Sequence, residues 1–471
     1  MTRVPPAPMF LHGFGARYDL PIPLTLYLYG AGAIVVLTFV LVGVFTRRDA
    51  GGTEIRYPRL EAPWLARAAN APASWIVGGV IGVVALVAVV VTGLLGSSDP
   101  TRNPAVYLVW IYLWVGLLLL TALAGGVWTY LNPFAALARW SGLDGGSGRS
   151  GNGRRHLPER IGIWPAVAAF FGVAWLELAS GVSSRPAVVA MLALAYTVYT
   201  LAGMAVFGRA VWLSRCEAFT VLFGVASRFG PVETERAPDG TVERAWLRPW
   251  GMGLLAPAAA GWDRIVFVIL MLSDLAFDGI EATPPWFALT QSATSLYEAV
   301  GAAAGRVVLD TAGLVAVALV FLGIFTLFVQ LMLALGGARH GRLATTTAFA
   351  FTLVPIALVY AFAHYYTYLL VQGQGLIPLL ADPLGRGWNL LPVGGFQANW
   401  TLAQANIVWD AQVVLIVLGH VIAVYLAHVC ARHRFRGAGR ALLSQYPMLI
   451  LMVAYTMTSL WILAQPITEG G

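Results

Sequence analysis

The chain has 471 residues, of which 59% are hydrophobic and only 11% are charged, and its mean hydropathy is +0.75. An ordinary soluble domain carries roughly 25% charged residues, so this composition excludes a soluble globular protein and indicates an integral membrane protein surrounded by a lipid bilayer. The net charge of +7 does not indicate nucleic-acid binding, because the basic residues lie in short loops between apolar segments.

Apolar segments of about 20 residues are long enough to cross roughly 30 Å of hydrocarbon. The sixth candidate is short and carries Asp263, Arg264 and Asp274, so nine spans remain an alternative. The sequence predicts an all-α polytopic fold with ten spans, at Leu24 to Thr46, Ser74 to Leu95, Ala105 to Trp128, Ile161 to Ser180, Pro186 to Phe207, Trp262 to Phe277, Thr311 to Leu335, Ala344 to Val371, Ile407 to Ala431 and Tyr446 to Ala464.

Arginine is concentrated in every second loop between these segments. The loops that follow the first, third, fifth, seventh and ninth spans contain most of the arginines, and the intervening loops contain few. Cytoplasmic loops carry the excess of basic residues. We therefore expect a multi-pass protein of the bacterial cytoplasmic (inner) membrane with both termini outside.

The polar segments are loops that connect the spans of a single transmembrane domain, residues 1–471. Residues 1–23 are expected to form an outer N-terminal segment, because the prolines near the start argue against a cleavable signal. Residues 141–160 form a Gly/Ser/Arg-rich cytoplasmic linker, in which flexibility is expected. The cytoplasmic loop 208–260 contains "CEAFTVLFGVASRF", predicted to be an amphipathic helix in the membrane interface, and an alternating stretch around Pro-Asp-Gly, predicted to be a hairpin.

Two further features concern the outer loop and the cysteines. Residues 373–406 mix polar groups with large apolar side chains, so we expect this outer loop to cap the helices. Cys216 and Cys430 fall on the expected cytoplasmic side, where thiols stay reduced, so no disulfide is predicted.

Three histidines occur in the stretch "GHVIAVYLAHVCARHR" of the ninth span. His433 and His428 are near the cytoplasmic surface, so both are expected to reach water. His420 is roughly 20 Å from the outer end of its span at about 1.5 Å per residue. An ionisable group at that depth is costly and normally faces the bundle interior.

The outer half of the membrane is expected to collect acids and an imidazole from several spans. His364, Asp410, Asp274 and Asp278 are predicted to line a common outer cavity, with His420 below it as a relay. Such groups suit a transition metal ion (Zn, Fe, Mn or Ni) or a proton pathway. The alternative for each acid is a helix cap in the interface, and for the histidine a hydrogen-bonded packing role. Secondary candidates are His12, Glu177, Asp310 and Gln374.

Five segments together resemble a family of bacterial multi-pass membrane proteins, most of them hypothetical and some labelled fenitrothion hydrolase. They are "HGFGARYDLPIPL", "AFDGIEATP", "AHYYTYLLVQGQGLIPLLADPLGRGWNL", "GHVIAVYLAHV" and "SQYPMLILMVAYTMTSLWILAQPI". The resemblance extends over nearly the whole chain. It implies an organophosphate-cleaving activity but assigns no catalytic residue.

Three functions are therefore compatible with the sequence. The first is transport or handling of a small solute or metal ion through the outer cavity. The second is a membrane-embedded hydrolase, in which a bound metal ion would lower the pKa of water. The third is a subunit or assembly factor of a larger membrane complex, with unknown partners.

Overall fold

The computed structural model describes residues 20–468 except 46–54, 56, 144–154, 238–239, 257, 338, 340, 394 and 436. Within this part of the chain, nine helical segments are long and apolar enough to cross a membrane, which confirms the all-α polytopic class. They are α1 (Leu24–Phe45), α3 (Pro72–Leu95), α4 to α5 (Pro104–Val106, the π-helical Tyr107–Gly116 and Leu117–Ala124), α8 (Trp164–Leu178), α9 (Pro186–Phe207), α15 (Ala302–Gly336), α16 and α17 (Arg342–Phe351 and Val354–His364), α20 (Ala405–Arg434), and α21 and α22 (Ala438–Leu443 and Gln445–Thr468).

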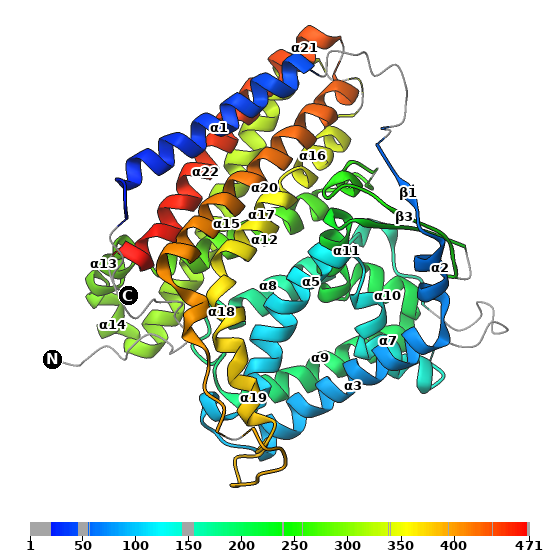
Figure 1. Ribbon diagram of the computed structural model, residues 1–471, viewed down its shortest axis with the longest axis vertical. Helices are drawn as coiled ribbons and strands as arrows, with labels where there is room; N and C mark the ends of the chain where they lie inside the picture. Colours follow the sequence, from blue (N-terminus) through cyan, green and yellow to red (C-terminus); the bar gives the residue numbers. More distant parts are fainter. Residues whose placement is uncertain are drawn as a thin grey trace.

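The sixth expected span is present as α12 (Trp262–Glu281), a 20-residue helix that is less apolar than the nine because of its acids. It is buried along most of its length and contacts α8, α15, α16, α17 and α22. Neighbouring helices therefore surround α12, and it lies among the other spans in Figure 1.

The segment expected to lie in the interface belongs to the protein core. It forms α11 (Ala218–Phe229), which meets α10 (Arg209–Arg215) at 70°. Its aromatic residues Phe219, Phe223 and Phe229 are buried. Glu217 makes this burial possible, because its carboxylate accepts the N–H groups of Phe219 and Thr220 at the start of α11.

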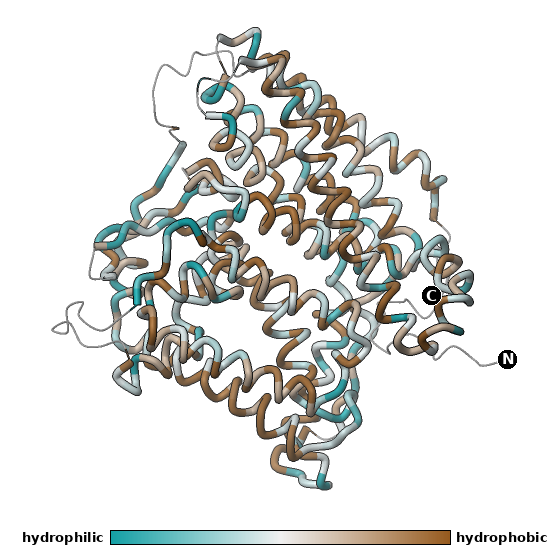
Figure 2. Tube along the Cα trace, turned by 180° about the vertical axis from the view of Figure 1, so that it is seen from behind, coloured by the Kyte–Doolittle hydropathy of each residue, from teal (hydrophilic) through white to brown (hydrophobic). Residues whose placement is uncertain are grey.

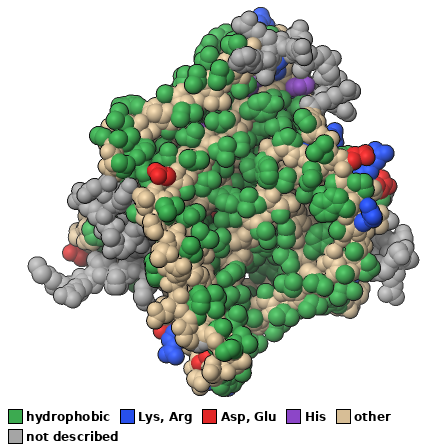
Figure 3. Space-filling model, in the orientation of Figure 1, with side chains coloured by type: hydrophobic (Ala, Val, Ile, Leu, Met, Phe, Trp, Pro, Cys, Tyr) green, Lys and Arg blue, Asp and Glu red, His purple; other side chains and the backbone are tan. Residues whose placement is uncertain are grey.

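The helices run between two polar ends. One end, called the arginine-rich end here, holds α21, α2 (Pro63–Asn70) and the small sheet; the other, the outer end, holds α13 (Pro284–Ser292), α14 (Thr294–Val300) and α19 (Leu376–Leu379). In Figure 1, α1 begins and α22 ends at the outer end. Figure 2 shows hydrophobic residues along the helices and hydrophilic residues mainly near the two ends. The face in Figure 3 is covered by hydrophobic side chains, as lipid contact requires.

Short helices complete the fold. At the arginine-rich end these include α6 (Trp128–Leu131) and α7 (Pro133–Trp140), and α18 (Tyr366–Leu370) follows α17 toward the outer end. Short 3-10 turns occur at Pro100–Arg102, Glu159–Ile161, Met252–Leu255, Gln372–Gly375 and Trp400–Ala403.

The outer loop is folded and is bonded to a membrane helix. Gly373 accepts a hydrogen bond from Tyr112, and the side chain of Gln374 accepts one from the backbone of Asn399. The large apolar side chains of the loop are 40–66% exposed, and their packing as a cap over the helices stays a prediction: Trp388, Leu390, Leu391, Phe396 and Trp400. Most of the outer N-terminal segment and of the 141–160 linker lies outside the described residues.

The arginine-rich end carries a three-stranded antiparallel sheet in the order β1-β3-β2. The expected hairpin consists of β2 (Val232–Arg236) and β3 (Val242–Leu247), and β1 (Leu60–Glu61) adds a short strand from the loop after α1. Sequence alternation did not identify β1, because two residues are too few to show a period.

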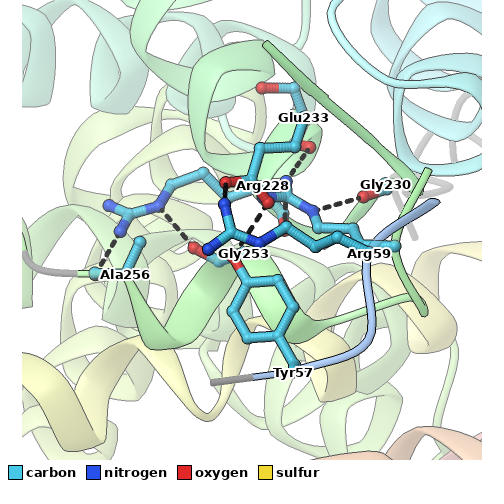
Figure 4. A network of polar contacts seen from close by, with 9 residues as sticks. Tyr57, Arg59, Arg228, Gly230, Glu233, Gly253 and Ala256 are labelled. Atoms are coloured by element: carbon cyan, nitrogen blue, oxygen red, sulfur yellow. Dashed lines mark hydrogen bonds and ion pairs between the residues drawn. The ribbon is translucent and has the colours of Figure 1, made fainter. Parts of the chain in front are cut away.

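A network of charged and polar contacts fastens this sheet to the helices (Figure 4). Glu233 accepts hydrogen bonds from Tyr57 at 2.9 Å, Arg59 at 2.9 Å and Arg248 at 3.1 Å. Arg248 also donates to carbonyls at the end of α11, including that of Arg228 at 3.2 Å. Burial, followed by the bond to Glu233, raises the pKa of the Tyr57 hydroxyl, so it stays a donor. Three segments distant in sequence are therefore joined at one carboxylate.

The topology predicts opposite accessibility for two exposed positions. Glu243 lies at the arginine-rich end and Gln397 in the outer loop, while the native Cys216 and Cys430 are buried and give little background. In intact cells, a membrane-impermeant maleimide should label Gln397→Cys, and should label Glu243→Cys only after the membrane is opened. The reverse pattern would overturn the orientation.

The network predicts unequal effects for two arginines that bind the same carboxylate. The Arg248 side chain is 7% exposed and also binds helix carbonyls, whereas that of Arg59 is 41% exposed. Arg248→Met should lower the free energy of unfolding by about 2–3 kcal/mol, and Arg59→Met by less than about 1 kcal/mol. Thermal unfolding of the two variants in the same detergent measures the difference, and equal losses would contradict it.

Candidate functional site

Three carboxylates follow one face of α12 in its last two turns. Asp274, Asp278 and Glu281 are spaced i, i+4 and i+7, and their exposed fractions are 6% for the first residue and 15% and 14% for the side chains of the other two. Like charges at i and i+4 repel, and the C-terminal end of a helix disfavours anions. This arrangement, called the α12 carboxylate stripe here, therefore destabilises the helix that carries it.

The end of α17 supplies hydrogen-bond donors to the stripe. Oδ2 of Asp278 lies 2.9 Å from Nε2 of His364 and accepts a 2.8 Å hydrogen bond from the hydroxyl of Tyr365. The His364 ring stacks on Tyr360, with centroids 5.6 Å apart and planes 17° apart. Because α17 ends at His364, both donors lie where its polar end meets α12.

A fourth carboxylate reaches the stripe from α8. Glu177 interacts electrostatically with Asp274 and Asp278, and the indole of Trp114, from the π-helical segment, lies beside it. Neither Oε2 of Glu177 nor Oδ1 of Asp274 has a hydrogen-bond partner among the described residues. A buried carboxylate oxygen without a partner is costly, so these groups require a proton, water or a cation.

An arginine closes the outer border of the site. Arg306 on α15 binds Asp310 at 2.6 Å and lies 3.6 Å from Glu281. One guanidinium is thus shared by two acids, while Oε2 of Glu177 and Oδ1 of Asp274 have no partner among the described residues. The site as a whole carries an excess of acid, which favours cations and disfavours anions.

The other sequence candidates are not brought into this cluster. Asp410 was expected to face His364, but it is exposed on α20. The physical reason is rotation: the adjacent Trp409 takes the inward position and packs edge-on against Tyr27. Gln374 holds the outer loop, and His12 lies outside the described residues.

Two histidines of α20 are buried in different environments. His420 is fully buried, with Nδ1 2.8 Å from the carbonyl of Ile416 and Nε2 without a partner among the described residues. His428 was expected to reach cytoplasmic water, but it is 4% exposed and lies 2.8 Å from Oε1 of Gln445 on α22. The expectation was wrong because α22 covers this end of α20.

Several residues of the site were missed from the sequence. Glu281 was identifiable, because it continues the spacing of Asp274 and Asp278 on one helix face. Trp114, Tyr365 and Arg306 gave no local signal, since their roles depend on which helices are neighbours.

The donor set does not fit a resident transition metal. Within the described residues, no group of three or more His, Cys, Asp and Glu side chains is arranged to hold a metal ion. His364 and Asp278 form a pair, whereas a structural or catalytic zinc site needs at least three protein ligands.

The orphaned carboxylate predicts an unusual stability effect. Asp274→Asn should raise the free energy of unfolding by about 1 kcal/mol, because the neutral amide removes repulsion and desolvation of charge. Asp382→Asn is the control: Asp382 accepts backbone N–H groups of Arg386 at 2.8 Å and Gly387 at 2.7 Å, so its loss should destabilise the protein. Thermal unfolding measures both variants, and a large destabilisation by Asp274→Asn would contradict the prediction.

Comparison with known proteins adds no assignment. No family model, curated protein or solved structure matches this chain. The resemblance to the hydrolase-labelled family therefore stays a prediction, and the site is interpreted from its own geometry.

Proposed function

We propose that this multi-pass membrane protein binds protons at the α12 carboxylate stripe and couples their binding to the passage of a small solute or cation. The observation that carries the proposal is the convergence of Glu177, Asp274 and Asp278 in a buried site where two of the three have an oxygen without a partner. Ionisable residues inside a membrane commonly mark ion pathways and proton relays.

The cost of the stripe supports a functional role. A helix end with three acids on one face is disfavoured by its own dipole and by repulsion. Stability alone would favour neutral residues at these positions. Proton binding removes the charge from an acid, and release restores it, so each event changes the force between α12 and α8.

His364 and Tyr365 have a defined part in this scheme. Both contact Oδ2 of Asp278, at 2.9 Å and 2.8 Å. Hydrogen bonds to the charged form of an acid favour that form. Asp278 is therefore the acid whose charge these donors stabilise, while Oδ1 of Asp274 and Oε2 of Glu177, which have no partner among the described residues, are the oxygens that take up protons.

A hydrophobic carbodiimide tests the proposal, because it modifies protonated carboxyl groups within membranes. In proteoliposomes we expect modification at Asp274 or Glu177, faster at lower pH, and its loss in Asp274→Asn combined with Glu177→Gln. Asp410→Asn is the matched control, since Asp410 is exposed on α20 and separate from the site.

A second readout measures charge movement directly. A pH jump applied to the same proteoliposomes on a solid-supported membrane should give a transient current that disappears in the double variant and persists in Asp410→Asn. Unchanged current and unchanged modification in the double variant would refute the proposal.

A further inference from the structure

Several buried groups that can exchange a proton lack partners below the stripe. The hydroxyl of Tyr360 on α17, Nε2 of His420 on α20 and the hydroxyl of Tyr455 on α22 form no hydrogen bond in the described chain, although these residues are 3%, 0% and 8% exposed. Oε1 of Gln412, on the same face of α20, is also without a partner. In hydrocarbon each such atom costs several kcal/mol unless something bonds to it.

Contacts between α17 and α20 order these groups by depth. Gln412 donates to the carbonyl of Ala363, which places it level with His364. Gly419 lies against Val359 and the carbonyl of Pro355, so His420 is level with that part of α17. Tyr360 falls between the two levels, about 6 Å below His364 at about 1.5 Å per residue.

Tyr360 connects the contact region between α17 and α20, called the seam here, to the α12 carboxylate stripe. Its ring stacks on His364, and its hydroxyl lies beside Gly279, the residue after Asp278. At the lower end, His420 is midway along α20, about 22 Å from its start at Ala405. The seam between α17 and α20 therefore runs from the outer site to the centre of the bundle.

The tautomer of His420 follows from its one contact. Nδ1 lies 2.8 Å from the carbonyl oxygen of Ile416, which can only accept, so Nδ1 carries the hydrogen. In the neutral ring Nε2 then has a free lone pair. It can accept a proton to give an imidazolium and return to the same neutral tautomer when that proton leaves.

We infer that a file of internal water runs in the seam between α17 and α20, from the α12 carboxylate stripe past Tyr360 to His420, and that His420 is the proton acceptor at its inner end. The inference rests on the proposed function for the direction of proton movement, but the hydration of the seam does not depend on it. The rise from Tyr360 to His364 along α17 is about 6 Å, a gap that one or two hydrogen-bonded waters can bridge.

Radiolytic footprinting in water labelled with oxygen-18 tests the hydration, because radicals formed from bound water modify adjacent side chains. Tyr360 and His420 should incorporate the isotope despite their burial, and Phe325 and Phe349, which are 0% exposed in apolar surroundings, should not. Absence of label at both Tyr360 and His420, with label present at the half-buried Tyr107, would overturn the water file.

His420→Leu tests the acceptor. It should reduce the pH-jump current severalfold while the carbodiimide still modifies the stripe. His428→Leu is the matched variant on the same helix: it should lower the melting temperature, since Gln445 loses its bond, and leave the current intact in the folded fraction.

An undiminished current in His420→Leu would overturn the role of His420. The two proposals fail separately. If the wild-type protein gives neither current nor carbodiimide modification, proton binding at the stripe fails, while the isotope label alone decides whether the seam is hydrated.

Discussion

The cost of an unpaired polar group in hydrocarbon is the constraint on which this structure depends. Most buried polar groups respect it: Asp263 accepts the backbone N–H of Ile163 at 2.7 Å, and the hydroxyls of Thr346 and Thr347 donate to carbonyls one turn earlier. The orphaned atoms that can exchange protons are gathered on α8, α12, α17, α20 and α22: Glu177, Asp274, Tyr360, His420 and Tyr455. Other unpartnered atoms, on Thr, Trp and Gln side chains, are spread over further helices of the described chain. The two acids and the imidazole are the ones that can change charge, and the proposed function rests on them.

Two buried carboxylates show the difference between a structural and a functional acid. Glu217 is fully buried, and it accepts hydrogen bonds from Tyr196, from Thr220 and from two backbone N–H groups, which fix the start of α11. Burial raises the pKa of the Glu217 carboxyl, and these four hydrogen bonds offset part of that effect. Asp274 is also buried, but one of its oxygens has no partner among the described residues and its neighbours include other acids. Burial alone does not separate the two cases, but the donors around each carboxylate do.

Composition, span length and arginine distribution were sufficient for the class of fold, because each depends on properties local in sequence. Order along a span was also predictable by counting residues, and the contacts of Gly419 with Pro355 and Val359 agree with a position of His420 below His364. Rotation about the helix axis was not, because it depends on neighbouring helices. Asp410 was therefore expected inside although Trp409 occupies that direction, and His428 was expected in water although α22 covers it. For α11, the sequence showed an amphipathic pattern. It did not show that the apolar face would pack against other helices of the protein and not against lipid.

The position of α12 follows from the same constraint. Among the long described helices it is the one that carries three acids on its inner face, and its charged residues keep it from counting among the apolar spans. Such a helix is costly to expose to lipid, and neighbouring helices cover it. Its buried residues extend from Asp263 near its start to Gly279 near its end. Enclosure has a second consequence: α8, α15 and α17 all contact α12, so a change in charge on the stripe acts on three helices at once. Under the proposed function, α12 is thereby the helix through which proton binding would act on its neighbours.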